Sequence, residues 1–120
     1  MKKFVNQWGI YMIDLGKGVG SIQGGVRPCL ILQNAIGNAH SPTTLVAPIT
    51  SATKSLIPPH YELLKQDYPF LKYDINTVLF EQVQPVNIQT QVLRYLGMVK
   101  EADKAFLLDT FLKNFILERE

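Results

Sequence analysis

The hydrophobic pattern of the chain changes its period once, near residue 101. Before this point short apolar runs alternate with turn residues, and all 8 glycines and all 7 prolines lie there. After it, apolar residues recur every three or four positions, as on one side of an α-helix. Several short strands followed by one helix, without repeats or linkers, predict a mostly β fold: a small antiparallel barrel with a C-terminal α-helix. The length of 120 residues fits one domain, residues 1–120.

Composition indicates the class of protein but says less about what the protein binds. A hydrophobic fraction of 47% and a charged fraction of 18% indicate a folded protein, and a net charge of +2 permits an anionic partner without requiring one. The single cysteine excludes an internal disulfide, and no Cys or His cluster has metal-ligand spacing, so we expect neither metal nor cofactor. No apolar run approaches the ~18 residues needed to cross a bilayer. We therefore expect a cytoplasmic protein without membrane contact.

Six segments have the composition of strands, and the fifth should bend or change neighbours: residues 8–15, 28–33, 43–49, 60–64, 76–86 and 92–99. Segment 28–33 is nearly all apolar, so it should be buried on both faces. We expect Pro28 at the first position of its strand, and Pro48 at an edge or a bulge. Segment 34–42 has the composition of a turn, and residues 16–25, 50–59 and 65–74 should be loops.

Residues 101–120 should form the helix. One stripe should face the barrel, and three neighbouring residues widen it; the stripe is Ala105, Leu108, Leu112, Phe115 and Ile116, widened by Phe106, Leu107 and Phe111. This stripe is wide for a helix that touches only its own barrel. Part of it could therefore meet a second subunit.

The stretch GSIQGGVRP, residues 20–28, places an arginine and three glycines directly before an apolar strand. Together with other segments in the same order along nearly the whole chain, it resembles the MazF/PemK (Kid) family of toxin endoribonucleases. The matching segments are Asp14-Leu15, Gly20-Ser21, Gln23 to Gly25, Arg27-Pro28, Leu30 to Asn34, Ala47 to Thr50, Pro59-His60 and Glu81 to Val83. The resemblance implies an SH3-like (CcdB/PemK/MazF-type) barrel that forms a homodimer.

The same resemblance implies an activity and two macromolecular partners. Such a toxin cleaves single-stranded RNA, including mRNA, at short sequences without a metal, and leaves 2′,3′-cyclic phosphate and 5′-hydroxyl ends. A cognate, MazE-like antitoxin holds it inactive. The implied catalytic residues are Arg27 and Thr50. The implied RNA- and antitoxin-binding residues are Ser21, Gln23, Gly24, Gly25, Ser51, Pro58 and His60.

The chemistry of these residue types agrees with that activity. When the 2′-oxygen attacks its own phosphorus, charge grows on the non-bridging oxygens, and a guanidinium offers them a fixed fork of donors. A threonine hydroxyl adds a neutral hydrogen bond. An arginine stays protonated at ordinary pH, so Arg27 is a poor general base, and we leave that role unassigned.

Simpler interpretations stay open for single residues. The glycine-rich loop could be only a turn, and Arg27 could pair with Asp14 or Glu81. His60 fits the wall of the groove better than a catalytic role, and Cys29 fits the core. One or two aromatic residues of loop 65–73 could stack on bases.

The chain also departs from the family pattern. Ile22 and Gln84 replace a usual glutamate and a usual arginine, and residues 7–9 replace an Arg-Gly-Asp triplet. These exchanges leave the cleavage sequence and the antitoxin undetermined. The alternative function is a non-catalytic toxin on the same barrel, either a CcdB-like gyrase binder or a degenerate member that only binds an antitoxin.

Overall fold

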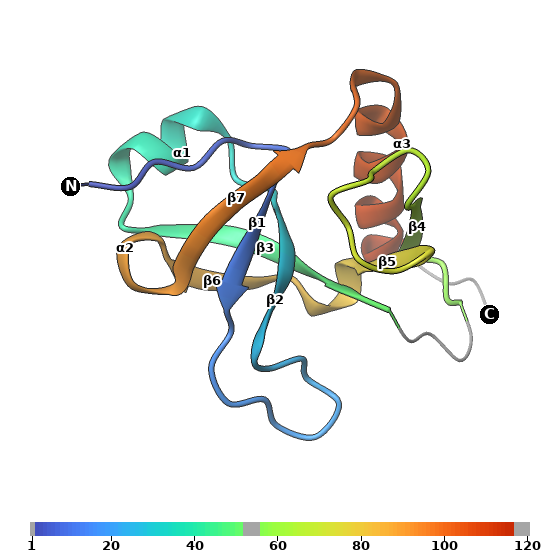
Figure 1. The fold of residues 1–120 in the computed structure, drawn as a ribbon, viewed down its shortest axis with the longest axis horizontal. Helices are drawn as coiled ribbons and strands as arrows, with labels where there is room; N and C mark the ends of the chain where they lie inside the picture. The colour runs from blue at the N-terminus through green and yellow to red at the C-terminus, as the bar shows by residue number, and fades with distance from the viewer. Residues whose placement is uncertain (1, 52–55, 117–120) are drawn as a thin grey trace.

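The computed structural model describes residues 2–51 and 56–116, and within them it is mostly strand with a C-terminal helix (Figure 1). The strands are β1 (Gly9–Asp14), β2 (Val26–Ile31), β3 (Thr43–Thr50), β4 (His60–Leu64), β5 (Ile75–Leu79), β6 (Gln84–Asn87) and β7 (Val92–Met98). The α-helices are α1 (Ala35–His40), α2 (Ile88–Gln91) and α3 (Glu101–Leu112), and the 3₁₀ turns are η1 (Phe80–Gln82) and η2 (Lys113–Phe115). None of these helices is long and apolar enough to cross a membrane.

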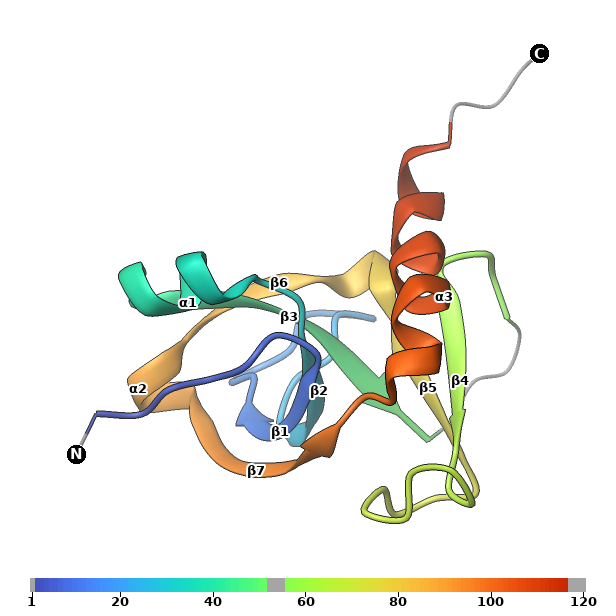
Figure 2. The same ribbon diagram turned by 90° about the horizontal axis from the view of Figure 1, so that it is seen from above.

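The strands form one curved antiparallel sheet in the order β4-β5-β3-β2-β1-β7, and β6 also pairs with β3. The curvature gives the barrel-like shape, and α3 stands beside β4 and β5 at one end (Figure 2). Apolar residues pack on both faces of the sheet. In β2, for example, Leu30 belongs to the core that α3 covers, whereas Cys29 and Ile31 belong to the other core. All three are 0% exposed, so residues 29–31 are buried on both faces as predicted, whereas the first half of the strand is exposed or half-buried.

On one edge of strand β3 the neighbour changes around Pro48: residues 43–46 pair with β6, whereas Ile49 and Thr50 pair with β5, and the register shifts by three residues. On the other edge, residues 46–48 pair with β2, and this ladder ends at Pro48. Pro48 does not mark an edge, because β3 is an internal strand, but the shift in register beside it is a bulge-like irregularity, which agrees with the other half of the prediction. A proline lacks the N–H that a continuous ladder needs, so it fits the point where one ladder ends and another begins. The ends of β2 and β3 consequently diverge.

The predicted bend in segment 76–86 is confirmed. Strands β5 and β6 both pair with β3, but their registers differ by three residues, the length of η1 between them. The turn η1 therefore projects from the sheet at the point where two ladders meet.

Two local expectations were wrong, and one short helix was not predicted. Segment 34–42 contains the short helix α1, because the Asn34 side chain accepts a hydrogen bond from the backbone N–H of Gly37 (3.0 Å) and caps it. Residues 88–91 form α2, capped in the same way by Asn87. Strand β2 begins at Val26, so Pro28 is its third residue and pairs with Met12. Proline is tolerated there because the ladder between β2 and β3 reaches no further than Cys29.

The predicted buried face of α3 was also wrong. Leu107 and Thr110 are buried, whereas Leu108 and Leu112 are about half exposed, at 48% and 50%. Apolar residues surround most of this helix, so their spacing alone did not select a face. The Tyr68 hydroxyl donates to the Asp103 carboxylate and thereby sets the rotation of the helix. The side chains of Asp109 and Lys113 form an ion pair at 4.0 Å.

Candidate active site

A pocket of about 430 Å³ lies where the ends of β2 and β3 diverge. It contains both predicted catalytic residues and is built from β1, β2, β3, β5, β7 and the β4–β5 loop. Its lining residues are Met12, Val26, Arg27, Pro28, Ile49, Thr50, Ser51, Phe70, Lys72, Tyr73, Asn76, Arg94 and Leu96. Its volume falls in the range of about 300–1,000 Å³ that is typical of ligand sites.

Arg27 is held on β2 opposite Ile13 and is partly buried. Its Nε donates to the backbone oxygen of Gly24 (3.0 Å). This hydrogen bond orients the guanidinium and so sets the direction of its terminal nitrogens. The two carboxylates considered as ion-pair partners bond elsewhere: Asp14 accepts from the N–H of Gly16 (2.9 Å), and Glu81 contacts His60. Within residues 2–51 and 56–116, no ion pair joins Arg27 to a carboxylate. The structure therefore gives no support to a simple structural ion pair.

Thr50 is the last residue of β3, and Ser51 follows it at the pocket wall. Cys29 of β2 pairs with Pro48 of β3. Arg27 lies two residues before Cys29, and Thr50 lies two residues after Pro48. Because side chains two residues apart share a face of a strand, Arg27 and Thr50 lie on the same face. The divergence of the strands leaves the space of the pocket between them.

The pocket is electropositive. Among the residues that the structure describes, three cationic side chains line it, those of Arg27, Lys72 and Arg94, and no carboxylate does. Such a lining favours an anionic ligand such as a phosphate. Sequence reasoning did not identify Lys72 or Arg94, since they lie on the β4–β5 loop and on β7, far from the motif. No local signal could have found them; only the sheet topology brings them here.

Two aromatic residues of the β4–β5 loop also line the pocket, Phe70 and Tyr73. Tyr73 is 47% exposed, and the Lys72 ammonium lies over its ring, 5.5 Å from the centroid. The hypothesis that one or two residues of loop 65–73 stack on bases thus concerns these two. Tyr68, in the same loop, is buried in the core at 2% exposure.

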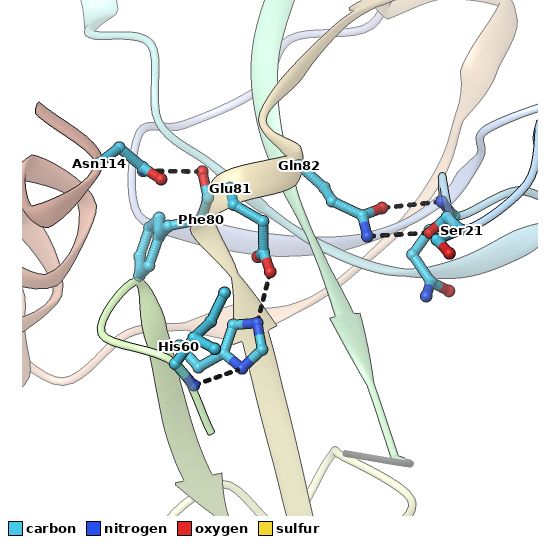
Figure 3. Close-up of polar contacts among 8 residues, drawn as sticks. Ser21, His60, Phe80, Glu81, Gln82 and Asn114 are labelled. Atoms are coloured by element: carbon cyan, nitrogen blue, oxygen red, sulfur yellow. Dashed lines mark hydrogen bonds and ion pairs between the residues drawn. The ribbon is translucent and has the colours of Figure 1, made fainter. Parts of the chain in front are cut away.

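The predicted loop residues Ser21 and Gln23 lie beside η1 and do not line the pocket (Figure 3). The Gln82 side chain accepts from the N–H of Gln23 (2.8 Å) and donates to the backbone oxygen of Ser21 (3.0 Å). The backbone at Gly24 lies too close to Gly18 for any side chain, since a Cβ on Gly24 would lie 2.8 Å from the Cα of Gly18. Gly25 has a φ of +75°, which favours glycine.

His60 also contacts η1. Its Nε2 lies 2.5 Å from the Glu81 carboxylate, and its Nδ1 accepts from the N–H of Ile57 (3.4 Å), so the neutral ring donates to Glu81 (Figure 3). The side chain is only 8% exposed and does not line the pocket. Pro58 is exposed in the turn before β4 and is likewise outside the lining. The sequence interpretation did not assign these contacts to Glu81 and Gln82.

Cys29 is buried in the core, as expected, and burial raises the pKa of its thiol to about 12, while the charge of Arg27 partly opposes the shift. In the described residues, no three His, Cys, Asp or Glu side chains are grouped so that they could hold a metal ion.

Comparisons with known proteins agree along nearly the whole chain. Residues 6–115 match the family described as PemK-like, MazF-like toxin of type II toxin–antitoxin systems. The chain is 37% identical over 116 residues to endoribonuclease EndoA of Bacillus subtilis (strain 168), covering 92% of this chain and 98% of the relative. It is 39% identical over 111 residues to endoribonuclease MazF of Staphylococcus epidermidis, covering 88% and 91%.

One solved structure with the same fold is an endoribonuclease in complex with its cognate antitoxin from Mycobacterial species. The TM-score is 0.73 at 20% identity, and the match covers 95% of this chain and 99% of that chain. This likeness confirms the expected fold class, a mostly β barrel with a C-terminal helix.

Proposed function

Because the chain belongs to the PemK-like, MazF-like toxins of type II toxin–antitoxin systems, we propose that it is a toxin endoribonuclease that cleaves single-stranded mRNA in the cytoplasm and so inhibits translation and growth. Its relatives in Bacillus subtilis and Staphylococcus epidermidis carry the name endoribonuclease. The observation that carries the proposal is the pocket itself, in which Arg27 and Thr50 share a lining that is electropositive and has no carboxylate among its described residues.

The proposed reaction needs little covalent chemistry from the protein. The 2′-oxygen of the substrate attacks the adjacent phosphorus and loses its proton, the P–O5′ bond breaks, and the leaving 5′-oxygen takes up a proton. The products are a 2′,3′-cyclic phosphate and a 5′-hydroxyl. Since the nucleophile is already part of the substrate, the enzyme mainly aligns it and stabilises the charge, and no metal is needed for either task. We assign no residue as the general base.

Arg27 stabilises the charge on the non-bridging oxygens with its terminal nitrogens, because its Nε is already bonded to Gly24. Thr50 contributes a hydroxyl from the same face of the sheet. Lys72 and Arg94 attract the neighbouring phosphates, and Phe70 or Tyr73 stacks on an unpaired base. Recognition of single-stranded RNA follows, because only unstacked bases reach these rings.

We further propose an antitoxin partner and a homodimer. A protein of the same fold is known in complex with its cognate antitoxin, and the β1–β2 loop beside the pocket is a suitable contact for one, through Ser21, Gln23, Gly24 and Gly25. Ser51, Pro58 and His60 extend this surface. The exposed apolar residues of α3 are suited to a second copy of the chain. The gyrase-binding alternative is not favoured, because the matched relatives are endoribonucleases.

The experiment is to incubate the protein with a long unstructured RNA in the presence of EDTA. We expect discrete fragments that end in cyclic phosphate, and none with the Arg27→Ala variant. Intact RNA after incubation with a folded, antitoxin-free protein would contradict the proposal and favour a binding toxin.

A further inference from the structure

We propose that Gln82 is a positioning residue that orients Arg27 through the β1–β2 loop, an inference that rests on the proposed function. Gln82 does not line the pocket, yet its side chain contacts the loop that holds the Arg27 guanidinium. Hydrogen bonds join Gln82 to Ser21 and Gln23, the backbone joins Gln23 to Gly24, and a further hydrogen bond joins Gly24 to Arg27.

The first link joins Gln82 to the loop. Both ends of its amide are used: the oxygen accepts from the N–H of Gln23 (2.8 Å), and the nitrogen donates to the oxygen of Ser21 (3.0 Å) (Figure 3). Only a group with one acceptor and one donor at this spacing satisfies both backbone groups. The amide therefore fixes the position and the orientation of this part of the loop.

The second link joins the loop to Arg27. Gly24, next to Gln23, accepts the hydrogen bond from Arg27 Nε (3.0 Å). The loop leaves little room for Gly24 to move alone, because a Cβ on it would lie 2.8 Å from the Cα of Gly18 and 2.9 Å from the oxygen of Gly16. A shift of residues 21–23 must consequently shift the acceptor that orients the guanidinium.

The turn η1, which carries Gln82, is itself held in place by packed elements. In η1, Phe80 is 1% exposed, its oxygen accepts from Asn114 of η2 (3.1 Å), and its ring packs edge-on against Phe111 of α3. Glu81 is bonded to His60 at the start of β4 (Figure 3). Three neighbouring residues of η1 thus contact α3, β4 and the β1–β2 loop. A site held by such packed elements keeps its geometry better than one held by a loop alone.

The first test compares Gln82→Ala with Gln89→Ala. Gln89 is a matched control, because its amide also makes two backbone hydrogen bonds, both to Lys3 (2.8 and 2.9 Å), and they involve neither η1 nor the β1–β2 loop. A misplaced catalytic group costs up to about 10²-fold in rate, so we expect Gln82→Ala to lower kcat by about 10- to 100-fold with KM nearly unchanged. Gln89→Ala should retain the wild-type kcat. Equal kcat values for both variants would overturn the proposal.

The second test asks whether Gln82 acts through Arg27. Arg27→Lys keeps a positive charge but has no Nε–H for Gly24. In this background Gln82→Ala should cost less than about twofold in kcat, because the link is already broken. The full loss in both backgrounds would show that Gln82 acts on the RNA directly and would overturn the proposal. Full activity of Arg27→Lys would instead contradict the role proposed for Arg27.

Hydrogen exchange keeps the proposal testable if a double variant is too slow to assay. In Gln82→Ala the amide of Gln23 should lose its protection, while that of Ile31 in β2 keeps it. Gln82→Glu retains the acceptor for Gln23 but loses the donor to Ser21, so its kcat should fall between wild type and Gln82→Ala. Unchanged protection of the Gln23 amide would contradict the proposal that Gln82 holds the loop.

Discussion

At the residue scale, the contacts of Arg27 distinguish it from the other cations of the pocket. Its Nε is bonded to Gly24 and it is partly buried, whereas Lys72 and Arg94 are exposed. A fixed guanidinium can meet charge that develops in the transition state, while mobile cations mainly attract the substrate. Arg27 should therefore influence kcat, and the other two should influence KM.

The first prediction concerns this division. Arg27→Ala should lower kcat by about 10³ to 10⁵, the range seen when a comparable arginine is removed in phosphoryl transfer. Arg94→Ala should mainly raise KM, and most strongly at low salt, where the attraction of a cation for the RNA is least screened. Steady-state cleavage of a short fluorescent RNA measures both. Lys104→Ala, which loses only an ion pair with Glu101 on α3 (2.8 Å), is the control and should be unchanged.

The second prediction concerns the buried thiol. Burial raises the pKa of Cys29 to about 12, so above about pH 9 the unfolded chain loses a proton that the folded chain retains. The free energy of unfolding should then fall with rising pH, by up to about 1.4 kcal/mol per pH unit from this group. Urea unfolding between pH 8 and 9.5 measures the slope, which should be smaller in Cys29→Ala. Identical slopes would show that the thiol ionises alike in both states.

At the scale of elements, the strands were predictable because each carries its own signal. Apolar and β-branched runs between turn residues located six strand segments, and Val83 and Pro85 indicated the bend that η1 produces. Helix α1 was missed because its six residues are too short for a periodic pattern, and only the Asn34 cap could have indicated it. The face of α3 depends on Tyr68, a partner distant in sequence.

The third prediction concerns packing between β7 and the pocket. A Cβ on Gly97 would overlap the Phe70 ring, with two of its atoms at 2.7 Å. Gly97→Ala should destabilise the fold by about 1–3 kcal/mol, as overpacking does. It should also raise KM, since Phe70 lines the pocket. Thermal unfolding and RNA binding measure the two effects. Leu93→Ala on the same strand, 49% exposed, should show neither.

At the scale of the whole molecule, the candidate site depends on the divergence of β2 and β3 after Pro48. The catalytic pair came from the resemblance, and the sheet register explains why those two residues share a face. The order of the strands in the sheet brings three further residues to the same pocket, Lys72, Tyr73 and Arg94. That order is a long-range property which local periodicity does not encode.

The fourth prediction concerns assembly. Leu108, Leu112 and Phe115 leave 48%, 50% and 64% of their surface exposed along one side of α3 and η2, more apolar surface than a monomer usually presents on one helix. We expect a homodimer, and Leu112→Lys should shift it toward monomer. Sedimentation velocity over a concentration series measures the change. Ile36→Lys, on exposed α1, should leave the dimer intact; a monomeric wild type would contradict the expectation.

The most direct test of the proposed reaction is cleavage of an RNA that carries a single 2′-deoxyribose at the cut site. In EDTA, we predict that the protein cleaves the all-ribose strand to a 2′,3′-cyclic phosphate and leaves the substituted strand intact at that position. Cleavage of the substituted strand would contradict attack by the 2′-oxygen, and a loss of all activity in EDTA would contradict a reaction that needs no metal.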